Sequence, residues 1–237
     1  MARAAAGGGT RAVATTSHIN TTFGLQPEDV ARARAQLSAR LAAEGVELEL
    51  LAGGEIAPER LPTLDDDALR ALALGGGSCV LLECPFAPVG STMERMVDDL
   101  GSRGFSVLLA HPERSATFQR EPHRLERLLE LGAWAQVTAG ALAGGFGELP
   151  RRAALRMLEA GLVHVLASDS HDARHRPPNP RLAESALAAR YGDLDAQLEW
   201  MTTAAPAAIV AGEPLPERPT LPKARGMVAR LRAWSAR

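Results

Sequence analysis

The feature that most constrains the fold is a pattern that recurs along the chain. A short apolar run ends on a polar residue, and a segment with helical periodicity follows. Five runs share this pattern, and they close on His18, Glu55, Glu83, His111 and Asp169, the last followed by His171. Such continuous apolar runs are typical of strands buried on both faces of a parallel sheet. The pattern predicts an α/β fold, either a doubly wound sheet or a barrel.

The segments around these runs supply the remaining elements. Residues 133–138 form a sixth apolar run that ends without a polar group. Helices are expected from Pro27 to Gly45, from Pro122 to Leu131 and from about Pro150 to Gly161. Proline in the first turn and glycine after the last turn are the usual signals for the ends of helices.

Length and composition indicate one globular domain with a short tail. The chain has 237 residues, of which 46% are hydrophobic and 23% charged, so it can bury a sizeable core. We expect a main domain at residues 1–212 and an extended proline-rich connector at 213–222. Residues 223–237 resume a helical pattern with several arginines, which favours a terminal helix packed on the domain.

Charge and hydropathy exclude several classes of protein. Lys and Arg number 26 against 28 Asp and Glu, so the net charge of −2 gives no general attraction to nucleic acid. No apolar run reaches the ~18 residues that a membrane span needs, and no signal peptide is visible. We therefore expect a cytoplasmic protein. Cys79 and Cys84 lie five residues apart in a predicted strand, so they point to opposite faces and form no disulfide.

The polar residues that close the runs predict a metal site. In both candidate folds the carboxyl ends of the strands meet at one edge. A single histidine at a strand end is more often a hydrogen-bonded polar group than a metal ligand. Five such polar residues, each at the end of a predicted strand, favour metal binding by the whole set. Imidazole and carboxylate groups that converge in this way suit a divalent cation.

Several short motifs surround these candidate ligands. In chain order they read Ala-Thr-Thr-Ser-His at 14–18, Gly-Gly-Glu-Ile at 53–56, Leu-Glu at 82–83, Ala-His-Pro-Glu-Arg at 110–114, Val-His-Val-Leu-Ala-Ser-Asp-Ser-His at 163–171 and Arg-Pro-Pro at 176–178. Through these motifs the chain resembles the polymerase-and-histidinol-phosphatase (PHP) superfamily. More narrowly, it resembles the manganese-dependent protein-tyrosine phosphatases of bacterial capsule and exopolysaccharide loci.

The resemblance implies a distorted (β/α)7 barrel that holds up to three metal ions at its carboxyl-terminal rim. Manganese is the expected metal, with iron or zinc as alternatives. The first strand of such a barrel carries a His-x-His pair and is followed by an acidic ligand, but no residues of this kind precede Thr10. We therefore expect the chain to begin inside the domain. Either its start codon is assigned too late, which the otherwise complete ligand set favours, or the protein is truncated.

The same resemblance assigns the metal ligands. It implies one metal site made of Glu55, Glu83 and His111, which lies wholly within this chain. The other two sites would each need a residue from the strand or loop that is not found. They would use Glu55 with Asp169, and His18 with His171.

The predicted site suits the hydrolysis of phosphate esters. Metal ions can polarise the phosphoryl oxygens and lower the pKa of an attacking water, while Arg114 and Arg176 would grip the non-bridging oxygens. A cysteine-based phosphatase would instead need an arginine six residues after its cysteine. Pro85 and Gly90 stand at that distance from Cys79 and Cys84, so the sequence excludes this mechanism.

Three functions remain open from the sequence. The first is a metal-dependent phosphotyrosine-protein phosphatase that attacks with a metal hydroxide, its partner being a bacterial tyrosine kinase that controls polysaccharide export. The second is a small-molecule phosphatase of the same superfamily, such as one for histidinol phosphate. The third is a catalytically impaired remnant that keeps only a binding role.

Overall fold

A parallel sheet forms the centre of the protein, as the apolar runs predict. The computed structural model describes residues 1–87 and 91–224. Its main sheet has the strand order β2-β4-β5-β6-β7-β8, and β1 and β3 form a separate parallel pair. The strands are β1 (Ala12–Ala14), β2 (Ser17–Ile19), β3 (Glu49–Leu51), β4 (Gly54–Ile56), β5 (Cys79–Glu83), β6 (Ser106–Ala110), β7 (Trp134–Thr138) and β8 (Val165–Ala167).

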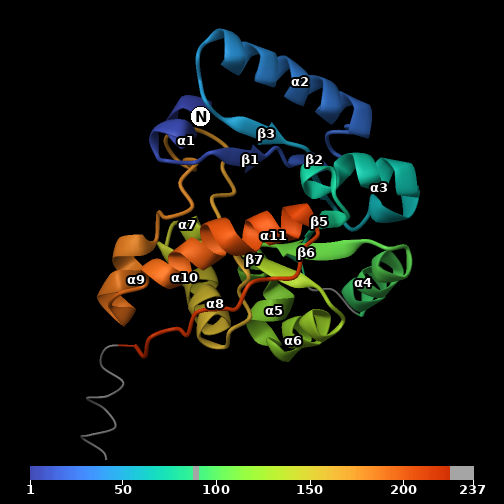
Figure 1. Ribbon diagram of the computed structural model, residues 1–237. Helices are drawn as coiled ribbons and strands as arrows, with labels where there is room; N and C mark the ends of the chain where they lie inside the picture. The colour runs from blue at the N-terminus through green and yellow to red at the C-terminus, as the bar shows by residue number, and fades with distance from the viewer. Residues whose placement is uncertain (88–90, 225–237) are drawn as a thin grey trace, which may run out of the picture.

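Helices connect these strands, which confirms the predicted α/β class. They are α1 (Ala2–Gly7), α2 (Pro27–Ala43), α3 (Asp66–Leu72), α4 (Thr92–Ser102), α5 (Ala116–Arg120), α6 (His123–Glu130), α7 (Ala139–Leu142), α8 (Glu148–Glu159), α9 (Glu184–Tyr191), α10 (Asp195–Glu199) and α11 (Ala205–Ala211). Figure 1 shows α2 with β1 and β3 in the upper part of the molecule and α5, α6 and α8 below the sheet. No helix in the described part has the length and apolar character that crossing a membrane requires.

The first two predicted strands are each interrupted, which the sequence did not indicate. Between β1 and β2, the Thr15 hydroxyl donates to the carbonyl of Leu51 at 3.0 Å, and the backbone N–H of Thr15 donates to the same oxygen at 3.1 Å. Between β3 and β4, the carbonyl of Ala52 accepts from the N–H of Gly75 at 2.9 Å. Beyond these points β2 and β4 join the main sheet, while β1 and β3 pair separately.

Side chains alternate between two apolar clusters across the sheet. Leu82 of β5 and Leu109 of β6 are neighbours in register, and both are fully buried in the larger cluster. Leu81 and Leu108 point to the other side, into a smaller group that we name the inner cluster. The inner cluster consists of Leu74, Cys79, Leu81, Leu108, Ala110, Val165 and Ile209. The sheet thus has an outer face that packs on helices and an inner face that encloses a second core.

The two cysteines confirm this alternation. Cys79 belongs to the inner cluster, whereas Cys84 belongs to the larger one. Both are buried and free, as expected for positions on opposite faces of a strand.

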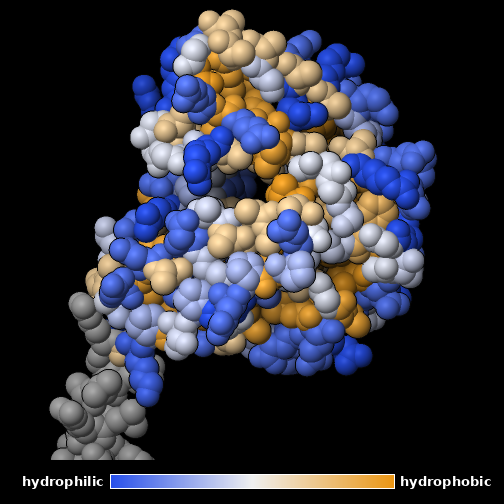
Figure 2. All heavy atoms as spheres, viewed as in Figure 1, coloured by the Kyte–Doolittle hydropathy of each residue, from blue (hydrophilic) through white to orange (hydrophobic). Residues whose placement is uncertain are grey.

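The inner face borders a cavity of about 570 Å³. Val13 of β1 lines it on one side and Val165 of β8 on the other, and in the described part no strand pairing joins β8 to β1 or β2. Figure 2 shows the surface hollowed between the upper part of the molecule and the body below it. The sheet is therefore open along this flank.

The predicted tail is described only in part. Residues 213–222 contain neither helix nor strand, and the side chains of Trp200 and Gln197 bond to the carbonyls of Pro216 and Pro219 in this stretch. Of the expected terminal helix, 223–237, all but residues 223 and 224 lie outside the described residues.

A glycine turn before β5 gives a test of the packing. Gly75 has φ +65°, and a Cβ there would overlap the side chain of Val210 on α11. Gly75→Ala should lower the free energy of unfolding by about 2–3 kcal/mol, measured by denaturant titration, because it adds this overlap to the backbone strain. Gly76→Ala is the matched control, since its φ is +77° but a Cβ would meet nothing within 4 Å. Equal losses from both variants would contradict the packing explanation.

His164 gives a test based on pH. Its Nδ1 accepts from the N–H of Ala135, and burial, aided by the charge of Arg218, lowers the pKa of His164 from 6.5 to about 4. The unfolded chain therefore binds more protons between these values. The free energy of unfolding should fall as the pH drops from 6.5 to 4, by about 2 kcal/mol after allowing for the ring's contact with solvent.

Denaturant midpoints are measured between pH 4 and 6.5 for the unchanged protein and for His164→Gln. The variant should lose this part of the pH dependence. If both proteins show the same slope, His164 is not its source.

Candidate metal centre

Glu55 lies at the centre of the predicted ligand set. It is in the middle of β4, directly beside His18 of β2 in the parallel register, and only 4% of it is exposed. Its Oε1 lies 2.8 Å from Nε2 of His111, and its Oε2 lies 3.3 Å from Nδ1 of His18. His111 follows β6 directly and is equally buried. The carboxylate thus joins two histidines that are distant in sequence.

Burial and charge act in opposite directions on these groups. Burial opposes ionisation of Glu55, but the hydrogen bond and charge of His111, with the charges of His18 and Arg114, hold the pKa of Glu55 below its usual value. Burial likewise lowers the pKa of His111, and the bond to Glu55 raises it above its usual value. The pKa of Glu83 is raised, first by burial and then by the charge of Glu55. The carboxylates of Glu55 and Glu83 therefore repel each other, and a cation bound between them would reduce this repulsion.

Three of the predicted ligands are placed as a divalent cation requires. One ligand atom each from His18, Glu55 and Glu83 lies within 4.8 Å of the others. His111 bonds to the same Glu55, and its buried Nδ1 has no hydrogen-bond partner. Nitrogen and oxygen donors of this kind suit manganese, iron or zinc. The residues present fit a bound metal ion. His18 lies with Glu55 and Glu83 in this cluster and also beside His171, the residue with which the resemblance pairs it.

Asp169 forms a second cluster with both predicted arginines. Its Oδ2 accepts from Arg114 at 2.9 Å and also from Arg176, and the Asp169 side chain is only 10% exposed. His171 lies nearby, with Nδ1 3.7 Å from Oδ1 of Asp169 and its ring 5.7 Å from that of His18. The structure therefore brings all eight predicted site residues to one edge of the sheet, with His171 at the more exposed rim.

The backbone at two of these residues is unusual. His111 has φ +39° and Asp169 has φ +47°, and in the described part no other residue except glycine has a positive φ. This left-handed conformation costs free energy for residues with a Cβ, and such residues tend to lie at functional sites. His111 follows β6 directly and Asp169 lies two residues after the end of β8, so the backbone turns sharply where each side chain enters the site.

Sequence reasoning missed the role of Glu113, two residues after His111. Glu113 is fully buried, and its Oε1 accepts from the N–H of Thr138 at the end of β7. Burial raises the pKa of Glu113 to about 7. The side chain thus ties the turn that carries His111 and Arg114 to the neighbouring strand. The Pro-Glu-Arg stretch after His111 was the available signal, because a carboxylate between proline and arginine in a buried turn needs a partner.

Sequence reasoning also missed three phenylalanines. The guanidinium carbon of Arg114 lies 4.7 Å from the centre of the Phe86 ring and 4.6 Å from that of Phe146. Arg176 lies 5.4 Å from the Phe146 ring, and Phe23 stacks against His18. Phe86 and Phe146 thus pack against Arg114, and Phe146 also packs against Arg176, as cations pack on aromatic rings. Only 4% of the residues are aromatic, so a phenylalanine shortly after each of two candidate ligands, His18 and Glu83, was the sequence signal for these contacts.

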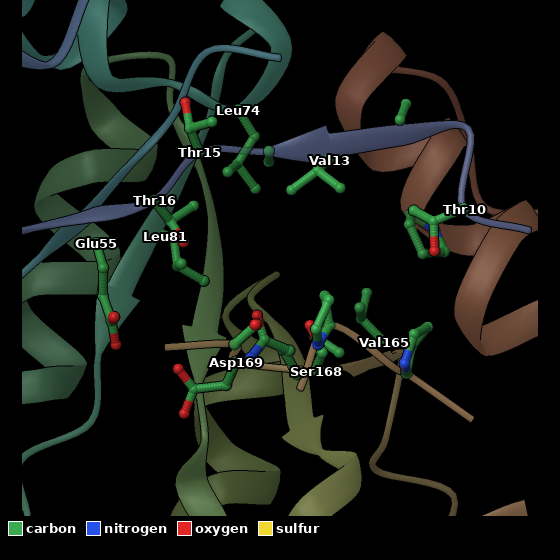
Figure 3. A pocket seen from close by; sticks show the side chains of 18 of the residues that line it. Thr10, Val13, Thr15, Thr16, Glu55, Leu74, Leu81, Val165, Ser168 and Asp169 are labelled. Carbon is green, nitrogen blue, oxygen red and sulfur yellow. The ribbon is translucent and has the colours of Figure 1, made fainter. Parts of the chain in front are cut away.

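The polar clusters form one end of the cavity described above. Figure 3 shows Glu55 and Asp169 at one end, with Val13, Leu74 and Val165 along the apolar walls. A charged ligand would therefore meet the site at this polar end, while the rest of the cavity favours apolar groups.

Comparison with known proteins identifies the family. Residues 1–210 match the family model described as capsular polysaccharide synthesis, CpsB/CapC. The chain belongs to the CpsB/CapC family. The resemblance to the capsule-locus branch of the PHP superfamily is thereby confirmed.

Relatives within the CpsB/CapC family carry names that describe an activity. The chain is 35% identical over 204 residues to tyrosine-protein phosphatase YwqE of Bacillus subtilis, covering 86% of this chain and 79% of that protein. It is 32% identical over 94 residues to tyrosine-protein phosphatase CpsB of Streptococcus pneumoniae, covering 38% of this chain and 39% of that protein.

A solved structure agrees with these matches. The fold superimposes with a TM-score of 0.78 and 32% identity on a chain from the crystal structures of YwqE and CpsB, described as unique metal-dependent tyrosine phosphatases. The match covers 94% of this chain and 89% of that one. The PHP-type architecture of the CpsB/CapC family therefore holds for this protein, as the sequence predicted.

Removal of the central carboxylate charge tests the metal centre. Glu55→Gln keeps the shape of the side chain but removes the charge that joins both histidines, so the affinity for Mn²⁺ should fall more than about 10-fold. Isothermal titration with MnCl₂ measures this. Glu49→Gln, at an exposed position on β3, is the control and should bind as the unchanged protein does. Equal affinity in all three proteins would place the metal elsewhere.

Proposed function

We propose that this chain is a metal-dependent phosphatase that hydrolyses phosphotyrosine in proteins. The observation that carries the proposal is the pair of arginines on Asp169, beside the cluster of His18, Glu55 and Glu83. Relatives that cover most of the chain are named tyrosine-protein phosphatases, which supports the same reaction.

The arginines supply the binding of the phosphate. Arg114 and Arg176 are only 18% and 25% exposed, and both guanidinium groups bond to Asp169 of the site. Asp169 orients both groups through these bonds. Planar guanidinium groups fit two oxygens of a phosphate, and the Phe146 ring beside both arginines limits their rotation. A phosphate would thus enter a site whose positive groups are already oriented.

The carboxylates and imidazoles hold the metal. His18, Glu55, Glu83 and His111, together with Asp169 and His171, are the residues that would hold it. When bound, the metal polarises the phosphoryl oxygens and lowers the pKa of a water molecule. Glu113, through its bond to Thr138, keeps the His111 turn in place.

Neither cysteine takes part in this chemistry. Cys79 and Cys84 are buried on opposite faces of the sheet, and burial raises the pKa of the Cys79 thiol to about 12. A thiolate nucleophile is therefore not formed at neutral pH. A phenol leaving group, with a pKa of ~10, departs without a strong acid, so a covalent intermediate is not needed.

The finer parts of the proposal concern the metal and the partner. We propose manganese as the metal in the cell. As partner we propose a bacterial tyrosine kinase of a capsule or exopolysaccharide locus, which fits the family's description as capsular polysaccharide synthesis. The expected cytoplasmic location belongs to the same proposal.

Substitution of an arginine tests the proposed role. Arg114→Gln removes a charged donor to the phosphate, so kcat/KM for a phosphotyrosine peptide with Mn²⁺ should fall about 100-fold. Arg40→Gln removes only an exposed ion pair with Glu44 and should leave the rate unchanged. The assay is run on the chain as printed and on any longer form that its reading frame encodes.

Two outcomes would contradict the proposal. If no form releases phosphate from phosphotyrosine although it binds Mn²⁺, the chain has a binding role instead. If kcat/KM for histidinol phosphate exceeds that for phosphotyrosine by more than about 10-fold, the enzyme acts on small molecules.

A further inference from the structure

The phenylalanines of this chain are unevenly distributed. The chain has five of them, and Phe105 and Phe118 lie in the larger apolar cluster. The other three, Phe23, Phe86 and Phe146, each contact a histidine or arginine of the candidate site. Phe23 and Phe86 are 62% and 49% exposed. Isolated apolar residues at a surface need no explanation, but two rings at the same site do.

Phe86 lies beside the deepest ligand of the site. Its ring stacks on that of His111 with centres 5.5 Å apart and planes inclined by 11°. The carbonyl of Phe86 accepts from the N–H of Ala116 at 3.2 Å, which fixes the residue to the start of α5. Phe86 nevertheless remains exposed, with Arg114 and His111 as the neighbours of its ring.

Phe23 occupies the corresponding position beside the other histidine of Glu55. Its ring lies 6.1 Å from that of His18, with planes inclined by 23°. Its N–H donates to the side chain of Asn20 at 2.9 Å, so the turn after β2 holds the ring in place. Because His18 and His111 both reach Glu55, the two exposed rings lie near the same metal cluster.

Phe146 has a different position. It is partly buried, and it packs against the guanidinium groups of Arg114 and Arg176. Its ring therefore supports the groups that bind phosphate. Phe86 also packs against Arg114, but Phe86 and Phe23 are exposed, whereas Phe146 is partly buried.

We propose that Phe86 and Phe23 determine specificity by receiving the aryl ring of the phosphate ester. This inference rests on the proposed phosphatase function and names how an aromatic ester is preferred to an alkyl one. An aryl group on a phosphate held by Arg114 and Arg176 would project past the metal ligands toward the exposed rings. Aromatic pairs gain stacking energy beyond the burial of apolar area, and an alkyl ester gains none of it.

Binding of two phosphonates, which resist hydrolysis, tests the proposal without turnover. Phenylphosphonate and methylphosphonate are titrated calorimetrically into the protein with saturating Mn²⁺. Leucine at either position keeps apolar bulk but removes the aromatic face. In the double variant Phe23→Leu with Phe86→Leu, phenylphosphonate affinity should fall about 3-fold to 10-fold while methylphosphonate affinity stays constant. Leu131→Ala, an exposed apolar residue after α6, is the control and should change neither affinity.

The outcomes separate this inference from the function on which it rests. If the unchanged protein binds neither phosphonate, the phosphate site itself is wrong. If it binds both and the double variant keeps the same ratio of affinities, the arginines bind phosphate but the rings do not select the ester. If the double variant loses both affinities equally, the rings only position Arg114 and the histidines, which overturns the specificity role. A kinetic comparison would add support for the specificity role. In the double variant, KM should differ less between phosphotyrosine and phosphoserine peptides than in the unchanged protein, with kcat unchanged.

Discussion

The parallel register of the sheet is the constraint on which the site depends. Because β2 and β4 run in the same direction, His18 stands directly beside Glu55, and both side chains point to the same face. The next two strands continue this alignment, so Glu83 ends β5 beside Ala110, the residue before His111. Ligands that are far apart in sequence therefore meet without any long loop to carry them.

The site also neutralises its own charges. Glu55 lies between two histidines, and Asp169 lies between two arginines, so each buried carboxylate has partners in the protein alone. A buried charge without a partner would be costly. A cation and a phosphate anion can exchange with these internal partners while the net charge of the site changes little. The arrangement suits a centre that holds a cation beside an anion.

The sequence predicted the strands and their closing residues well, because apolar runs and polar strand ends leave a local signal. It did not predict the breaks at Thr15 and Ala52, where hydrogen bonds to Leu51 and Gly75 lie between the two sheets. The contacts of the phenylalanines with His111 and Arg114 were equally invisible, because they join segments that only the fold brings together. The burial of Glu113 has the same origin. The hydrophobic periodicity of a sequence indicates on which face of a strand or helix a residue lies. It does not indicate which residues from other segments contact it there.

The left-handed backbone at His111 and Asp169 has a consequence for how such a protein changes over generations. Glycine adopts this conformation without cost, so replacing either residue with glycine would relieve the backbone while removing a ligand. The same substitution would remove Asp169 from Arg114 and Arg176, or His111 from Glu55, and would leave these buried or partly buried charges without those partners. The strained backbone at these two positions is therefore retained because each side chain pairs with a charge that the fold has already removed from water.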